Sequence, residues 1–251
     1  MLMLNDLLDF FFPRYCVLCG KRLTKGEQHL CLPCYMHLPR TMYHTVEHGK
    51  MEKLFWGTLP VERATAFFHY TDATKEMLIQ LKYNSYPQLG EYLASQFARE
   101  IEDSGFFEDI DIIVPVPLHW LRRMRRGYNQ SEYIAQGISK VVGIPVCTKA
   151  VRRTTNNKSQ TLMHKTERKE NVDNIFKLLH PCMLENKHVL IIDDVTTTGA
   201  TISSLAKEIV KAQNTKLSVL TLSIAGQTPV PPNDLEPLPS VSIKTETVSR
   251  L

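Results

Sequence analysis

The sequence lacks the features that mark membrane-spanning and secreted proteins. No window of the 251-residue chain approaches 18 uninterrupted apolar positions, so no membrane-spanning helix is expected. The first twelve residues have no basic region and carry Asp6 and Asp9, which makes them a poor signal peptide and favours a short amphipathic helix. No internal repeat is present. Together these absences predict a cytoplasmic protein.

Two common nucleotide-binding motifs are also missing. The chain has no G-x-G-x-x-G segment and no Gly-Lys-Ser/Thr Walker loop, which excludes the usual dinucleotide fingerprint and the P-loop. A net charge of +4 is compatible with an anionic ligand or with nucleic acid and selects neither. With 43% hydrophobic residues, a chain of this length can bury one sizeable core and carry a small appendage.

Four of the six cysteines form two C-x-x-C pairs near the N-terminus. Cys16 and Cys19 are separated from Cys31 and Cys34 by eleven residues, and Gly20 supplies the permissive backbone that a metal knuckle needs. Four thiolates suit tetrahedral zinc at a closed structural site. Two alternatives remain open: disulfides, which a cytosolic chain disfavours, and a thioredoxin-like redox pair, which needs a β-α-β context. We therefore predict structural zinc, which either staples a small module or helps it to bind nucleic acid.

One stretch of the sequence predicts a binding site for an anion. The apolar run 189–192 reads as a buried strand of a parallel sheet, and Asp193 and Asp194 stand at its carboxyl end. A short loop of hydroxyl residues follows, and a helix is expected to begin near Gly199. This geometry directs backbone N–H groups and the positive end of a helix dipole toward one spot, where a phosphate fits. The residues expected around that phosphate are Thr196, Thr197, Thr198, Gly199, Ala200 and Thr201.

The acidic pair distinguishes this loop from a simple phosphate site. Two carboxylates would repel a bare phosphate unless they serve sugar hydroxyls or a metal, although Asp194 could instead only cap nearby N–H groups. The stretch resembles the phosphoribosyl-pyrophosphate (PRPP) signature of type I phosphoribosyltransferases. The resemblance implies that the acids hold the ribose 2′- and 3′-hydroxyls and the loop holds the 5′-phosphate. Thr196 departs from that pattern, which prefers an aliphatic residue.

An arginine run follows a short predicted strand at 111–116. Four arginines fall within five positions, and Pro115 and Pro117 stiffen the chain before them. We expect the run to lie in a loop between strand and helix, where arginine can bind pyrophosphate in a bidentate manner. A nucleic-acid patch or an ordinary solvated surface are the alternatives, and Trp120 and Tyr128 flank the run as base stacking would require. The residues of this expected anion loop are Pro117, Leu118, Arg122, Arg123, Arg125 and Arg126.

Hydrophobic periodicity predicts the remaining elements of the main domain. We expect strands at about 61–70, 145–149, 173–179 and 216–225, and helices at about 74–83, 87–101 and from 129 onward. The long, polar and basic segment 151–171 is typical of a lid that excludes water from a reactive intermediate. The Pro-, Ser- and Thr-rich tail at 227–251 is expected to be disordered or loosely attached.

As a whole the chain resembles the ComF family (ComFC/GntX-like proteins) from about residue 5 to 226. The motifs are Val-Pro-Val-Pro-Leu-His at 114–119, Arg-Gly-Tyr-Asn-Gln at 126–130, and Arg152, Gln160 and Arg168 in a hood loop. Tyr128 stands where phenylalanine is more usual. The resemblance implies an α/β, type I phosphoribosyltransferase-like fold, with a parallel sheet flanked by helices, a flexible hood loop and a zinc-ribbon-like module. The expected division is 1–50 for the N-terminal helix and zinc module, 51–226 for the phosphoribosyltransferase-like domain and 227–251 for the tail.

The same resemblance implies three functions, which the sequence leaves open. In the first, Mg²⁺ bridges the ribose and diphosphate oxygens of PRPP, and Asp193 and Asp194 stabilise a cationic ribose during transfer to an unknown acceptor. In the second, the chain binds PRPP or a nucleotide without chemistry. In the third, it handles single-stranded DNA during natural transformation, beside a helicase partner. Members of the family are named for DNA uptake in competence or for the use of DNA as a nutrient.

Overall fold

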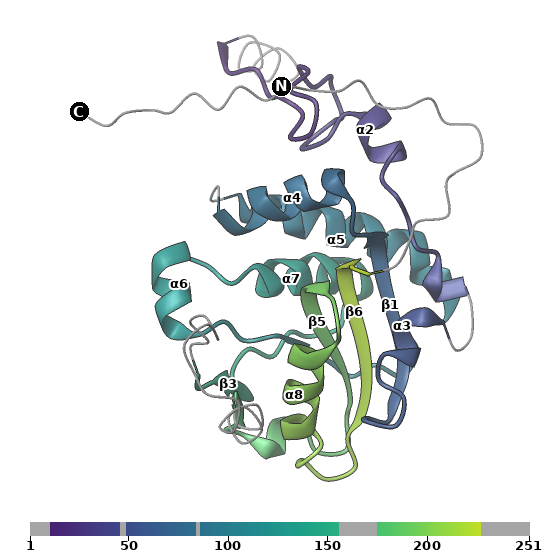
Figure 1. The fold of residues 1–251 in the computed structure, drawn as a ribbon, viewed down its shortest axis with the longest axis vertical. Coiled ribbons are helices and arrows are strands. Elements are labelled where there is room, and N and C mark those ends of the chain that lie inside the picture. The colour runs from purple at the N-terminus through teal and green to yellow at the C-terminus, as the bar shows by residue number, and fades with distance from the viewer. Residues whose placement is uncertain (1–10, 46–48, 84–85, 156–174, 227–251) are drawn as a thin grey trace. The chain divides into compact units, whose positions relative to one another are not determined.

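A computed structural model describes residues 11–45, 49–83, 86–155 and 175–226 (Figure 1). The chain forms two compact units, of which one ends at Leu38 and the other begins at Pro39. The domain boundaries expected at residues 50 and 226 stay predictions. Residues 1–10 of the expected N-terminal helix, the hood-loop residues Gln160 and Arg168 and the whole tail lie outside the described ranges. Within those ranges, no helix has the length and apolar character that crossing a bilayer requires.

The larger unit is built on a four-stranded parallel sheet with the strand order β1-β6-β5-β2 (Figure 1). Its strands are β1 (Val61–His69), β2 (Ile112–Pro115), β5 (His188–Thr196) and β6 (Lys216–Ile224). The run Val189–Ile192 is fully buried, as the sequence predicted for a strand that is covered on both faces. Two short strands, β3 (Val151–Arg153) and β4 (Phe176–Leu178), form a separate antiparallel pair.

Helices cover both faces of the sheet. On one face, α8 (Ala200–Ile209) packs against β5 in the same apolar cluster as Val189 and Ile191 (Figure 1). Leu190 and Ile192 alternate with these residues and therefore point to the other face, where α7 (Gln130–Val142) packs on β5 and β2. The remaining helices are α2 (Leu32–Met36), α3 (Lys50–Lys53), α4 (Asp72–Tyr83), α5 (Pro87–Ile101) and α6 (Trp120–Arg126), with short 3-10 turns at Tyr43–Thr45, Glu102–Ser104 and Pro181–Met183. A parallel sheet flanked by helices, with a four-cysteine module, confirms the expected fold class.

The close contact between α5 and α7 depends on a glycine. A Cβ atom placed on Gly137 would lie 2.2 Å from the backbone carbonyl oxygen of Glu91, a distance that real side chains do not reach. The two helices can therefore approach each other only because position 137 has no side chain.

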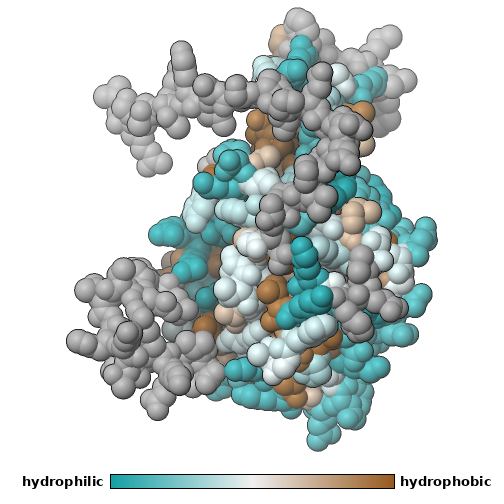
Figure 2. All heavy atoms as spheres, turned by 45° about the vertical axis from the view of Figure 1, so that its right-hand side comes forward, coloured by the Kyte–Doolittle hydropathy of each residue, from teal (hydrophilic) through white to brown (hydrophobic). Residues whose placement is uncertain are grey.

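Figure 2 shows the outside of the molecule, where the face in view is mostly hydrophilic and its apolar side chains form small groups.

Short flanking segments cover both outer strands of the sheet. Along β1, the N–H of Thr41 donates to the carbonyl of Phe67 and the N–H of His69 donates to the carbonyl of Pro39. Along β2, the N–H of Ile113 donates to the carbonyl of Pro145. The prediction of a strand at 145–149 is wrong, because this segment makes only an isolated bridge between Ile113 and Val146. Proline lacks an N–H, so Pro145 cannot donate a hydrogen bond to a ladder.

Candidate functional site

The acidic pair lies within strand β5. The sequence predicted a loop immediately after Asp194, but the pairing with β6 continues to Thr196, which matches Ile224 in register. Both acids are therefore held by the sheet itself, in a more rigid position than a loop would give. A turn at 197–199 then leads into α8, and Gly199 at the turn has φ +74°, a left-handed conformation that glycine adopts without strain.

The loop after β5 surrounds a small cavity of about 50 Å³. It is lined by Asp193 and by residues 195–202, so the structure brings the first acid and the hydroxyl loop together. Thr197 and Thr198 are exposed, whereas Thr196 is buried and its Oγ1 has no hydrogen-bond partner among the described residues. A buried hydroxyl without a partner is uncommon in a folded protein, and a bound ligand would supply what it lacks.

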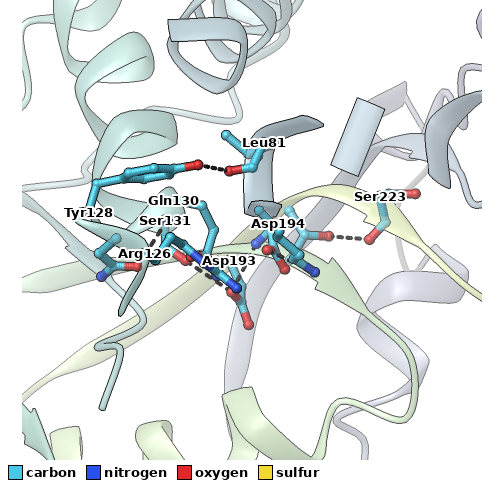
Figure 3. A network of polar contacts seen from close by, with 11 residues as sticks. Leu81, Arg126, Tyr128, Gln130, Ser131, Asp193, Asp194 and Ser223 are labelled. Carbon is cyan, nitrogen blue, oxygen red and sulfur yellow. Dashed lines mark hydrogen bonds and ion pairs between the residues drawn. The ribbon is translucent and has the colours of Figure 1, made fainter. Parts of the chain in front are cut away.

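Asp193 is buried and receives two hydrogen bonds on the same oxygen. The hydroxyl of Ser131, at the start of α7, donates to Oδ1 at 3.0 Å, and the N–H of Asp194 donates to it at 2.9 Å (Figure 3). Burial, followed by the negative charge of Asp194, raises the pKa of Asp193 to about 7. The hydrogen bonds and the positive charge of Lys82 act in the opposite direction. This carboxyl group therefore titrates near neutral pH.

Asp194 faces the opposite side of the strand and contacts a lysine. Lys82, in the last turn of α4, places its Nζ 3.0 Å from Asp194 Oδ2. Asp194 is 4% exposed, and its Oδ2 has no aligned hydrogen-bond donor among the described residues. Its contact with Lys82 is therefore an ion pair. Neither Lys82 nor Ser131 was predicted from the sequence as a site residue. Each lies far from the acids along the chain, and a lysine at a helix end is typical of any exposed surface.

The arginine run forms helix α6, and the prediction of a loop there is wrong. The ring Nδ1 of His119 accepts a hydrogen bond from the N–H of Leu121 at 3.3 Å and so caps the helix, which Gly127 ends at φ +85°. Arg123 makes a bidentate ion pair with Glu132, with N–O distances of 2.7 and 3.1 Å.

Arg126 is also engaged with its neighbours. It bonds to the side-chain oxygen of Gln130, and its guanidinium lies over the ring of Tyr83 at 5.5 Å. Two of the four arginines expected to bind pyrophosphate are thus bound to other side chains of this protein.

A larger cavity of about 310 Å³ lies beyond the end of β2. Pro117, Leu118 and Arg123 line one part of it, and Arg152 and Arg153 line another. The remaining lining residues are Pro115, Glu132, Thr148, Lys149, Val151, Leu179 and His180. Arginines and a lysine outnumber the single acid, so the cavity suits an anion.

Arg153 is a site residue that was not predicted from the sequence, which pointed to the neighbouring Arg152. Burial lowers its pKa and the charge of Arg122 lowers it further, whereas the charge of Asp193 acts in the opposite direction. Its guanidinium lies 5.4 Å from the ring centroid of Phe176. Arg153 is thus half-buried and feels the charge of the acidic pair, while Arg152 is exposed.

The four N-terminal cysteines converge as the sequence predicted. Their sulfur atoms all lie within 4.8 Å of one another, and Cys16, Cys31 and Cys34 are buried. In the first knuckle, the N–H of Gly20 donates to the carbonyl of Cys16 at 2.9 Å.

The thiol pKa values indicate that this cluster needs a nearby cation. Burial raises the pKa of Cys31 and of Cys34. These two thiols would stay protonated without a nearby cation, and zinc supplies the positive charge that stabilises thiolates. The donor set therefore fits zinc in a closed tetrahedral site.

Comparisons with known proteins give a consistent group of relatives. No protein-family model matches the chain. The DNA utilization protein YhgH of Escherichia coli K12 is 29% identical over 195 residues, which cover 76% of this chain and 82% of that protein. Competence protein F of Haemophilus influenzae is 26% identical over 200 residues, 78% of each chain. Competence protein ComFC of Bacillus subtilis is 25% identical over 210 residues, 77% of each chain.

Solved structures with a related arrangement cover just over half of this chain. The allosteric regulatory enzyme of purine biosynthesis matches 57% of this chain and 29% of its own, with a TM-score of 0.40 and 17% identity. An adenine phosphoribosyltransferase matches 55% of this chain and 71% of its own, with a TM-score of 0.37 and 15% identity.

Proposed function

We propose that the chain, whose relatives are named as competence and DNA utilization proteins, is a ComF-like protein that binds PRPP with Mg²⁺ at the carboxyl end of β5. The observation that carries this proposal is the shared cavity of Asp193 and the hydroxyl loop. A carboxylate suits sugar hydroxyls, and the loop with its helix N-terminus suits a phosphate. The 5′-phosphate would occupy the loop cavity and the ribose would lie on Asp193.

The pyrophosphate end of the ligand would lie in the larger, positively charged cavity. Arg153 supports this assignment, because it lines that cavity and also interacts electrostatically with Asp193. Mg²⁺ usually binds through substrate phosphates with few protein ligands, so it would enter with PRPP and neutralise the diphosphate. The half-buried arginine fits the diphosphate of this ligand, and the carboxylates fit its ribose hydroxyls.

Transfer of the phosphoribosyl group would follow from the same geometry. An acceptor nucleophile forms a bond to ribose C1 while the bond from C1 to the pyrophosphate oxygen breaks, and the electron pair leaves with pyrophosphate. Asp193 would stabilise the positive charge that develops on the ribose, and Arg153 and Lys149 would stabilise the departing pyrophosphate. The acceptor would have to enter from outside the two cavities.

Calorimetric titration of PRPP with Mg²⁺ into the full-length protein tests the proposal. We expect saturable binding that Asp193→Asn weakens by about 10- to 100-fold, because the variant loses a charged hydrogen-bond acceptor for a sugar hydroxyl. Asp103→Asn, which changes an exposed acid far along the chain, serves as the matched control and should bind as the natural protein does. Absence of saturable binding to the natural protein would overturn the proposal.

A second candidate function rests on the exposed face of α6. Trp120, which precedes the arginines of α6, is 59% exposed, and Met124, which lies between them, is 74% exposed. An exposed aromatic ring beside positive charges suits the bases and phosphates of single-stranded DNA. The names of the relatives, which refer to DNA utilization and competence, agree with this function. A helicase partner stays a prediction.

Fluorescence anisotropy with a labelled single-stranded oligonucleotide tests this second function. Loss of one stacked base costs about 1–3 kcal/mol, so Trp120→Ala should weaken binding by roughly 5- to 100-fold. Trp56→Ala removes an equally exposed tryptophan elsewhere in the chain and should have little effect. Equal binding by both variants would show that α6 is not the surface that holds the strand.

A further inference from the structure

Three consecutive residues at the end of α4 contact three different parts of the site. The carbonyl of Leu81 accepts a hydrogen bond from the Tyr128 hydroxyl at 2.5 Å (Figure 3). Lys82 contacts Asp194, and the ring of Tyr83 lies under the guanidinium of an arginine from α6. Lys82 is thus held by neighbours on both sides, and its side chain is only 21% exposed. This arrangement differs from that of a lysine at an ordinary helix end, which extends into water.

The surroundings of the acidic pair make Lys82 its main source of positive charge. Among the described residues, Lys82 is the one cation in ion-pair contact with either acid. Arg153, from β3, acts on Asp193 electrostatically, and Ser131, from α7, donates a neutral hydrogen bond. Without Lys82, the two buried carboxylates would have only Arg153 and Ser131 as side-chain partners in the described part of the chain, and neither forms an ion pair with them.

Asp193 and Asp194 leave β5 on opposite sides, but the combined negative charge of two neighbouring carboxylates attracts a divalent cation. Mg²⁺ and Mn²⁺ both prefer carboxylate oxygens, and affinity rises with the negative charge of the site. The ammonium of Lys82 cancels one of the two charges and lies against the oxygen of Asp194 that has no aligned donor. Neutral hydroxyl groups can still donate hydrogen bonds to such a pair, whereas a bare dication meets a neighbouring positive charge.

We propose that Lys82 is a positioning and specificity-determining residue, which holds Asp194 and reserves the acidic pair for the neutral hydroxyls of a sugar by excluding bare divalent cations. The role in binding the sugar rests on the proposed PRPP site. The exclusion of bare cations does not, because it concerns the protein without PRPP. The two parts can therefore be tested separately on the same variants.

The experiment is a titration of Mn²⁺ into the full-length, zinc-loaded protein at pH 8 without PRPP, followed by electron paramagnetic resonance. Lys82→Met is expected to bind Mn²⁺ roughly tenfold or more tightly than the natural protein, because the nearby positive charge is gone. Adding Asp193→Asn to this variant should abolish the gain. Lys82→Arg, which restores the charge, should bind Mn²⁺ as weakly as the natural protein. Lys75→Met removes an exposed lysine from the same helix and is the matched control.

Each outcome decides one part of the proposal. Equal Mn²⁺ binding by the natural protein and Lys82→Met would overturn the role of Lys82 in specificity. A gain of Mn²⁺ binding in Lys82→Met, with no PRPP binding by the natural protein, would support Lys82 and reject the PRPP site. If circular dichroism shows that Lys82→Met is not folded, Lys82→Gln takes its place, because it removes the charge and keeps a polar side chain of similar length.

Discussion

Replacing Cys34 with serine is expected to remove zinc and to unfold the N-terminal unit. All four sulfur atoms lie within 4.8 Å of one another, so each can supply one of the four ligands of a tetrahedral site. The unit ends at Leu38 and is too small to fold on an apolar core alone. Structural zinc contributes about 10 kcal/mol or more to the folding free energy of such modules, and a site that lacks one thiolate loses most of this contribution.

Metal analysis and limited proteolysis check this prediction together. The natural protein should carry one equivalent of zinc and resist cleavage before Leu38, whereas Cys34→Ser should carry none and be cleaved rapidly. Cys182→Ser is the matched control, since Cys182 is exposed and does not belong to the cluster. Full zinc content in Cys34→Ser, or no zinc in the natural protein, would contradict a four-cysteine zinc site.

Asp193→Asn is expected to make the ligand-free protein less sensitive to rising pH. In the folded protein the pKa of Asp193 is raised to about 7, whereas an unfolded chain has an aspartate pKa of about 3.9. The stability that the protonated group contributes is fully present below the unfolded pKa and is lost as the pH rises through the folded pKa. The total loss is up to about 4 kcal/mol, of which roughly half falls between pH 5.5 and pH 8. Asparagine cannot ionise and does not suffer this loss.

Urea unfolding at pH 5.5 and pH 8 measures the effect. The free energy of unfolding of the variant, minus that of the natural protein, should increase by about 2 kcal/mol between the two values. Other titrating groups are the same in both proteins and cancel in this difference. Asp103→Asn should show no such increase. Parallel pH dependence of the natural protein and Asp193→Asn would mean that Asp193 is already ionised at pH 5.5 when the protein is folded.

The sequence could predict the parts of the site that are contiguous along the chain. The apolar run before Asp193 has a length and a content of branched residues that are typical of a buried strand, and the glycine and hydroxyls after Asp194 mark a turn into a helix. The end of the strand was placed too early, because residues 195 and 196 are paired by β6, whose register the sequence does not reveal.

Other parts of the site come from segments that meet only in the folded chain. Lys82, Ser131 and Arg153 belong to three different elements, and none carries a local pattern that distinguishes it from an ordinary surface residue. Helix α6 was expected to be a loop between a strand and a helix. The sequence gives no clear sign of its start, since its cap is a histidine, a residue that is not among the preferred N-caps.

The covered outer strands of the sheet have a consequence for how this protein meets other chains. An open strand edge presents unpaired amide and carbonyl groups, which other polypeptides can join by β-augmentation or by aggregation. Here the segments at 39–41 and 145–147 already bond to β1 and β2 at these positions. Self-association by adding strands is thereby blocked where these segments lie. Contacts with partners are expected to use helices and loops, so crowding in the cell should not extend this sheet from one molecule to the next.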